Sequence, residues 1–102
     1  MENKIKFTDN AKKDLKESVN FYEERKIGLG ENFLNSVKEK SKQIQSKPEV
    51  NPADEDGIRK AKVKVFPFYI YYIFKIPVIT IIAIWHIARL PFSKSDRIES
   101  IE

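Results

Sequence analysis

The chain has 102 residues and a mass of 12.0 kDa, which is the size of one compact domain and too small for two. It contains no cysteine, which excludes a disulfide framework, a cysteine-type zinc site and a cysteine nucleophile. No apolar stretch reaches the roughly 20 residues that span a bilayer, and no secretory signal is visible. We therefore expect a cytoplasmic protein without a membrane partner.

The net charge of +4 is unevenly distributed along the chain. Residues 1–47 hold eleven basic and eight acidic residues, and residues 48–57 hold four acidic residues and no basic one. Residues 58–97 hold eight basic residues and one acid, Asp96, which gives this segment a net charge of +7. The positive charge is therefore concentrated in the C-terminal half, which favours an anionic partner.

The first half predicts a short strand followed by two helices. Residues 4–7 alternate between polar and apolar, and residues 8–10 favour a helix N-cap. Apolar side chains then recur every three or four positions, which predicts one helix to about Arg25 and a second helix that ends before Pro48. Gly28 and Gly30 mark the stop and the restart between them.

The second half predicts three strands. Residues 59–66 alternate, which places Lys60, Lys62 and Lys64 in a row on one face. The segments 68–75 and 78–87 are apolar or aromatic at both alternating sets of positions, as in strands covered on both faces. From about residue 92 we expect a polar tail.

In the last of these strands we place His86 on the side of Ile82 and Ile84. The same alternation places Trp85 on the side of Ile81 and Ala83.

The order β-α-α-β-β-β predicts a single α+β domain over residues 1–102, with a helical hairpin packed on one face of a mainly antiparallel sheet. Two helices can cover only one face of such a sheet. Because two strands are apolar on both faces, we expect the other face to be strongly curved or covered by a partner.

Taken together, these segments resemble the RelE/ParE superfamily of type II toxin–antitoxin toxins. The resemblance runs from residue 5 to residue 91, and its most specific parts are Phe66-Pro67-Phe68-Tyr69-Ile70-Tyr71-Tyr72 and Ile84-Trp85-His86-Ile87-Ala88-Arg89-Leu90-Pro91. It implies a growth-inhibiting toxin that a cognate antitoxin protein neutralises in a hetero-oligomer. Such an antitoxin would cover the surplus apolar surface.

The resemblance leaves two activities open. Relatives similar to RelE and YoeB cleave mRNA on the ribosome, whereas relatives similar to ParE block DNA gyrase. The mRNA-cleaving relatives usually carry a Tyr or His near the C-terminus, and residues 90–102 contain neither. We therefore favour a ParE-like, non-catalytic toxin. The alternatives are a ribosome-dependent mRNA endonuclease and a non-toxic relative that only binds an antitoxin or nucleic acid.

If the protein is a nuclease, metal-free phosphoryl transfer would use Arg59, Lys62, His86 and Arg89. His86 is the sole histidine, and the alternative role for it is a hydrogen bond to a neighbouring loop. Arg59 either grips phosphate or pairs with Asp56 or a C-terminal acid. Arg89 matches the recurrent C-terminal arginine of the family.

The candidate contacts to nucleic acid or target are the basic side chains Arg59, Lys60, Lys62, Lys64 and Arg89. The alternative role for the lysines is protection of an edge strand against aggregation. Tyr69, Tyr71 and Trp85 are the candidate antitoxin contacts. No metal-ligand cluster, phosphate loop or cofactor motif is visible, so we expect no metal and no cofactor.

Overall fold

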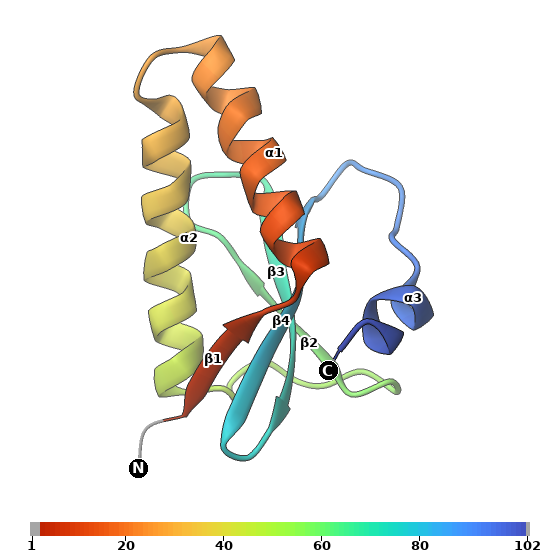
Figure 1. The fold of residues 1–102 in the computed structure, drawn as a ribbon. Coiled ribbons are helices and arrows are strands. Elements are labelled where there is room, and N and C mark those ends of the chain that lie inside the picture. Colours follow the sequence, from red (N-terminus) through yellow and green to blue (C-terminus); the bar gives the residue numbers. More distant parts are fainter. Residues whose placement is uncertain (1–2, 102) are drawn as a thin grey trace.

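The computed structural model describes residues 3–101, which form one sheet and three helices. Figure 1 shows their order. The elements are β1 (Lys4–Phe7), α1 (Asp9–Arg25), α2 (Leu29–Ser46), β2 (Ile58–Lys62), β3 (Phe68–Lys75), β4 (Val78–His86) and α3 (Lys94–Glu99).

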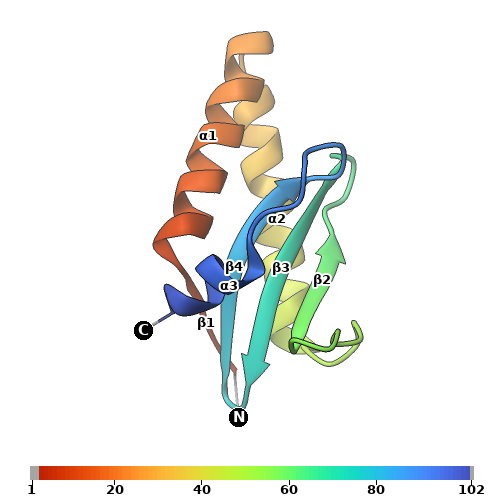
Figure 2. The same ribbon diagram turned by 90° about the vertical axis from the view of Figure 1, so that its right-hand side faces the viewer.

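The four strands lie in the order β1-β4-β3-β2. The first strand runs parallel to β4, whereas β2, β3 and β4 form an antiparallel meander. Helices α1 and α2 cover one face, here called the helix-covered face, and the opposite face is here called the second face (Figure 2). This arrangement confirms the α+β prediction of a helical hairpin on a mainly antiparallel sheet.

The helical hairpin forms where the sequence supplies caps. The Thr8 hydroxyl accepts a hydrogen bond from the Ala11 amide and begins α1. Gly28 has a left-handed φ of 91° and begins α2. The Glu23 carboxylate accepts hydrogen bonds from the amides of Gly28 and Gly30, which satisfies donors at the start of that helix.

The main core lies between the two helices and the helix-covered face. Helix α2 contributes the fully buried side chains of Phe33 and Val37. The sheet contributes alternate residues of its central strands, and the largest of these are Ile70, Tyr72, Ile79, Ile81 and Ile84. Burial of these side chains supplies most of the driving force for folding.

A β-bulge in β4 corrects the predicted faces of that strand. Tyr71 pairs with Ala83 and Tyr72 pairs with Ile81, so Ile82 is an extra residue without a partner on β3. Ile82 and Ala83 therefore both pack on the second face. Beyond the bulge, Ile84 returns to the helix-covered core.

The prediction of a polar C-terminal tail was incomplete. Residues 94–99 form the short helix α3, and Phe92, Ile98 and Ile101 pack on the second face. Figure 2 shows this segment lying across the sheet opposite α1 and α2. The expected surplus of apolar sheet surface is thus partly covered by the chain itself.

Candidate functional site

An aromatic and cationic cluster occupies the second face. Lys62, Tyr69 and Trp85 lie opposite one another on β2, β3 and β4, and the next row holds Lys60 and Tyr71. The Lys60 ammonium lies 4.6 Å from the centre of the Tyr69 ring, a cation–π contact. The three aromatic residues predicted as antitoxin contacts therefore lie on one face, next to one of the predicted lysines.

Trp85 is the buried centre of this cluster. Its indole N–H donates a hydrogen bond of 2.8 Å to the Leu90 carbonyl, so the ring is fixed against the turn that follows β4. The Phe92 ring packs on it at 5.3 Å between centroids and on Tyr71 at 4.9 Å. Burial raises the pKa of the Tyr71 hydroxyl, which moves its ionisation further above neutral pH.

Arg89 stacks its guanidinium over Trp85 at 3.8 Å from the ring centre. Its side chain is exposed and, within residues 3–101, has no acidic partner. The stacking restricts the side chain while leaving its N–H groups free to bind a carboxylate or a phosphate. Lys60 likewise has no acidic partner among the residues that the structure describes.

Arg59 points away from this cluster. Its guanidinium donates hydrogen bonds to the carbonyls of Asn51 and Glu49, in the connection after α2. Neither of the predicted acidic partners, Asp56 or a C-terminal acid, pairs with it in the part of the chain that is described. Arg59 therefore holds a loop in place.

The predicted row of three lysines is interrupted because β2 ends at Lys62. The Lys62 ammonium donates hydrogen bonds of 2.7 Å to the carbonyls of Val63 and Phe66 and closes the turn between β2 and β3. Lys64 lies within that turn and is exposed. Of the three, only Lys60 contacts an aromatic ring of the cluster.

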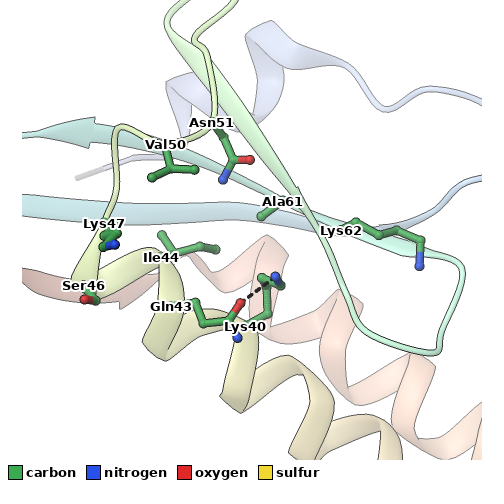
Figure 3. A pocket seen from close by; sticks show the side chains of 9 residues that line it. All are labelled: Lys40, Gln43, Ile44, Ser46, Lys47, Val50, Asn51, Ala61 and Lys62. Carbon is green, nitrogen blue, oxygen red and sulfur yellow. Dashed lines mark hydrogen bonds between the residues drawn. The ribbon is translucent and has the colours of Figure 1, made fainter.

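Lys62 also lines a hollow between α2 and β2, which is an edge strand of the sheet. Figure 3 shows Ile44 and Ala61 at the bottom of this hollow, with Lys40 and Lys47 at its rim and the Lys62 ammonium pointing away. The Lys40 ammonium donates a hydrogen bond to the Gln43 side chain. A basic rim at an open strand edge favours acidic segments over basic ones.

His86 faces the helix-covered side, with its ring 5.1 Å from that of Phe68. Its Nδ1 accepts a hydrogen bond of 2.9 Å from the Ala88 amide, which is the structural role set out above as the alternative. Because Arg89 stacks on the second face, the side chains of His86 and Arg89 lie on opposite faces of the sheet. The four residues proposed for catalysis are not brought together in this conformation.

Sequence reasoning missed an ion pair at the edge of β4. Asp14 of α1 is 5% exposed and accepts hydrogen bonds from Arg97 at 2.7 Å and from the Ile84 amide at 3.1 Å. Arg97 also donates to the Ile82 carbonyl at 2.9 Å. The signal was the position of Asp14, three residues after Ala11 on the buried stripe of the helix.

Among residues 3–101, no group of three or more histidine or acidic side chains is placed to hold a metal ion. None of the helices in that range is long and apolar enough to cross a membrane.

The family model of the ParE toxin of the type II toxin–antitoxin system parDE matches residues 5–91. The chain belongs to the ParE toxin family. A search of curated proteins finds no match. This ParE-family fold is also similar to the solved structure of a chromosomal ParDE toxin–antitoxin system from P. aeruginosa, with a TM-score of 0.70 and 22% sequence identity. The match covers 82% of this chain and 95% of the other.

Proposed function

We propose that this ParE-family protein is a cytoplasmic toxin that inhibits growth by binding DNA gyrase, and that a cognate antitoxin neutralises it. The observation that carries the proposal is the match of the ParE toxin family over residues 5–91. The resemblance described under the sequence points in the same direction, because the C-terminal Tyr or His of the mRNA-cleaving relatives is lacking.

The placement of the basic residues supports binding over cleavage. His86 Nδ1 is occupied by the Ala88 amide, and Arg59 is occupied by two loop carbonyls. General acid–base catalysis needs such groups gathered within hydrogen-bonding reach of one phosphate. Cleavage of ribosome-bound mRNA through Arg59, Lys62, His86 and Arg89 is therefore the less favoured alternative. The RNA assay described below tests it.

The second face supports an antitoxin site. Lys60 and Arg89 each lie over an aromatic ring and have no acidic partner in the described chain. An acidic antitoxin segment that crossed Tyr69 and the exposed edge of Tyr71 would pair with both cations and add apolar contacts. Trp85 would contribute by holding Arg89 in position.

The test combines a gyrase assay with an RNA assay on the same purified protein. We expect inhibition of plasmid supercoiling by gyrase, with ribosome-bound mRNA left intact. Addition of the purified product of the adjacent open reading frame should restore supercoiling. That rescue should weaken for Lys60→Glu, which reverses a cation of the second-face cluster, and persist for the exposed control Lys75→Glu, which lies at the other end of the sheet.

Full gyrase activity at excess toxin would refute the gyrase proposal. Cleaved mRNA under the same conditions would establish the nuclease alternative. Rescue that is unchanged by Lys60→Glu would refute the second-face antitoxin site.

A further inference from the structure

Val65 adopts a backbone conformation that its side chain disfavours. Its φ is +76°, and no other non-glycine residue within 3–101 has a positive φ. A β-branched residue is strained in the left-handed region because its branched Cβ crowds the backbone. Strain of this kind persists where something else requires it.

The fold requires the turn but not the valine. The reversal at Val65 allows Val63 and Phe66, on either side of it, to point into the core, where they are 0% and 7% exposed. Val65 itself is 82% exposed and buries almost nothing. Glycine or asparagine would make the same turn with less strain. Neither the packing nor the backbone of this chain explains an apolar, branched side chain here.

Two further apolar side chains are exposed at the same end of the sheet. Ile87 is 52% exposed and Leu90 is 84% exposed. The Ile87 amide donates a hydrogen bond of 2.9 Å to the Pro67 carbonyl, which joins the segment after β4 to the turn that carries Val65. Figure 2 shows both connections at the same end of the sheet. We name Val65, Ile87 and Leu90 the apolar tip.

The charges near the apolar tip are positive. Lys64 precedes Val65, and Arg89 precedes Leu90; both are exposed. The sequence has no acidic residue between Gly57 and Asp96. A surface of exposed aliphatic side chains with cationic neighbours is complementary to an apolar hollow in another protein with acidic side chains at its rim.

We propose that the apolar tip is the surface through which the toxin contacts its protein target. This inference rests on the proposed function and adds a location to it. Val65, Ile87 and Leu90 enter an apolar hollow of the target, and Lys64 and Arg89 pair with acidic side chains around that hollow. A nucleic-acid backbone would offer phosphates to the two cations but no apolar surface for Val65, which is why a protein is the partner that fits.

The test compares Val65→Asn with Ile76→Asn. Asparagine tolerates the left-handed region, so Val65→Asn keeps the turn and removes only the apolar side chain. Ile76 is 80% exposed in the turn between β3 and β4, at the opposite end of the sheet, and is therefore a matched control. We expect Val65→Asn to raise the concentration for half-inhibition of gyrase about tenfold. Ile76→Asn should leave that concentration unchanged, and the melting temperature of Val65→Asn should equal or exceed that of the wild type.

Several results would overturn the inference. One such result would be inhibition of gyrase by Val65→Asn at the same concentration as by the wild type. Another would be a loss of inhibition for Ile76→Asn as large as that for Val65→Asn. If Val65→Asn also lost binding to the protein encoded by the adjacent open reading frame, the tip would be an antitoxin contact and not a contact specific to the target.

Failure of the gyrase proposal can be distinguished from failure of the inference about the apolar tip. If the wild type does not inhibit gyrase, growth arrest after induction replaces the gyrase readout, and arrest by Val65→Asn equal to that of the wild type overturns the inference. A wild-type chain that neither inhibits gyrase nor arrests growth overturns the proposed function and the inference together.

Discussion

Asp14 and Arg97 bind backbone groups at the edge of β4 where its pairing with β1 ends. The first strand pairs with β4 only as far as Ile81, and the bulge at Ile82 disturbs the pattern immediately afterwards. The Ile84 amide and the Ile82 carbonyl are then bound by the Asp14 carboxylate and the Arg97 guanidinium. The ion pair therefore completes the hydrogen bonding of the strand and attaches α3 to the sheet.

Arg97→Ala tests this attachment. The substitution leaves the Asp14 carboxylate buried without its cation, which should lower the free energy of unfolding by about 3 kcal/mol. Urea denaturation of the full chain measures the change. The control is Lys94→Ala, which removes an exposed ion pair with Asp54 and should have little effect. Equal stability of the two variants would show that the ion pair does not hold α3.

Among individual residues, the predicted orientations were least accurate in β4. Strict alternation predicted the faces of its residues, and one extra residue at Ile82 changed them. Trp85 lies on the second face with Ala83, as expected, whereas Ile81 belongs to the helix-covered core. A bulge depends on pairing with β3, and no property of the single strand reveals it. His86 and Arg89 were grouped in one proposed site as basic residues near each other in sequence, and their side chains lie on opposite faces because Arg89 follows the end of β4 and stacks on Trp85.

At the scale of elements, the contact between α1 and α2 depends on Gly30. A Cβ atom at this position would lie 2.7 Å from the Val19 carbonyl oxygen and 3.0 Å from the Glu23 Cβ. The two helices can approach this closely only because Gly30 has no side chain. The sequence predicted only that Gly30 marks the start of the second helix. Its role in helix packing depends on the position of α1, which the sequence pattern does not give.

Gly30→Ala should therefore destabilise the protein although alanine favours helices. We expect a loss of about 1–3 kcal/mol, because the backbone of α1 must move to relieve the clash. Thermal unfolding measures the loss. Asn35→Ala on the exposed side of the same helix serves as the control and should be neutral or slightly stabilising. A melting temperature for Gly30→Ala at or above that of the wild type would contradict this account.

The elements themselves were largely predictable, and the reason is physical. Periodicity of apolar residues, the cap at Thr8 and the break at Pro48 act locally, so one strand, two helices and the meander follow from the sequence. Helix α3 was not predicted because four of its six residues are charged. Its contact with the sheet is made by Ile98 and by Phe92 and Ile101, which flank the helix. Such a short element forms through packing against β4 rather than through its own pattern.

At the scale of the whole molecule, α3 is also tied to the connection between α2 and β2. Lys94 donates a hydrogen bond of 2.9 Å to Asp54, whose other carboxylate oxygen accepts from the amides of Asp56 and Ile58. The hydrogen bond from Lys94 holds the pKa of Asp54 below its usual value of 3.8, and the same contact raises the pKa of Lys94. The ionised pair thus links two distant segments across the second face.

This link predicts a pH dependence with a definite sign. Because the pKa of Asp54 is lower in the folded state, its contribution to stability is present above pH 3.8 and is lost as the pH falls through the folded-state pKa. Asp54→Asn keeps the carbonyl acceptor for the two amides and removes the charge. The wild type should be slightly more stable than Asp54→Asn at pH 6, and their urea midpoints should converge at pH 2. A constant difference across this range would refute the assignment.

The sheet topology also has a consequence for the synthesis of the protein. The first strand pairs only with β4, the last strand to leave the ribosome, and Arg97 bonds to Asp14 across 83 positions of the chain. Contacts this distant in sequence can form only after both segments have left the ribosome, and they form more slowly than local contacts. The sheet and its second face are therefore completed only after β4 and Arg97 have been translated and have left the ribosome. A nascent chain in which these segments are still enclosed has β1 without its partner strand and Asp14 without its cation.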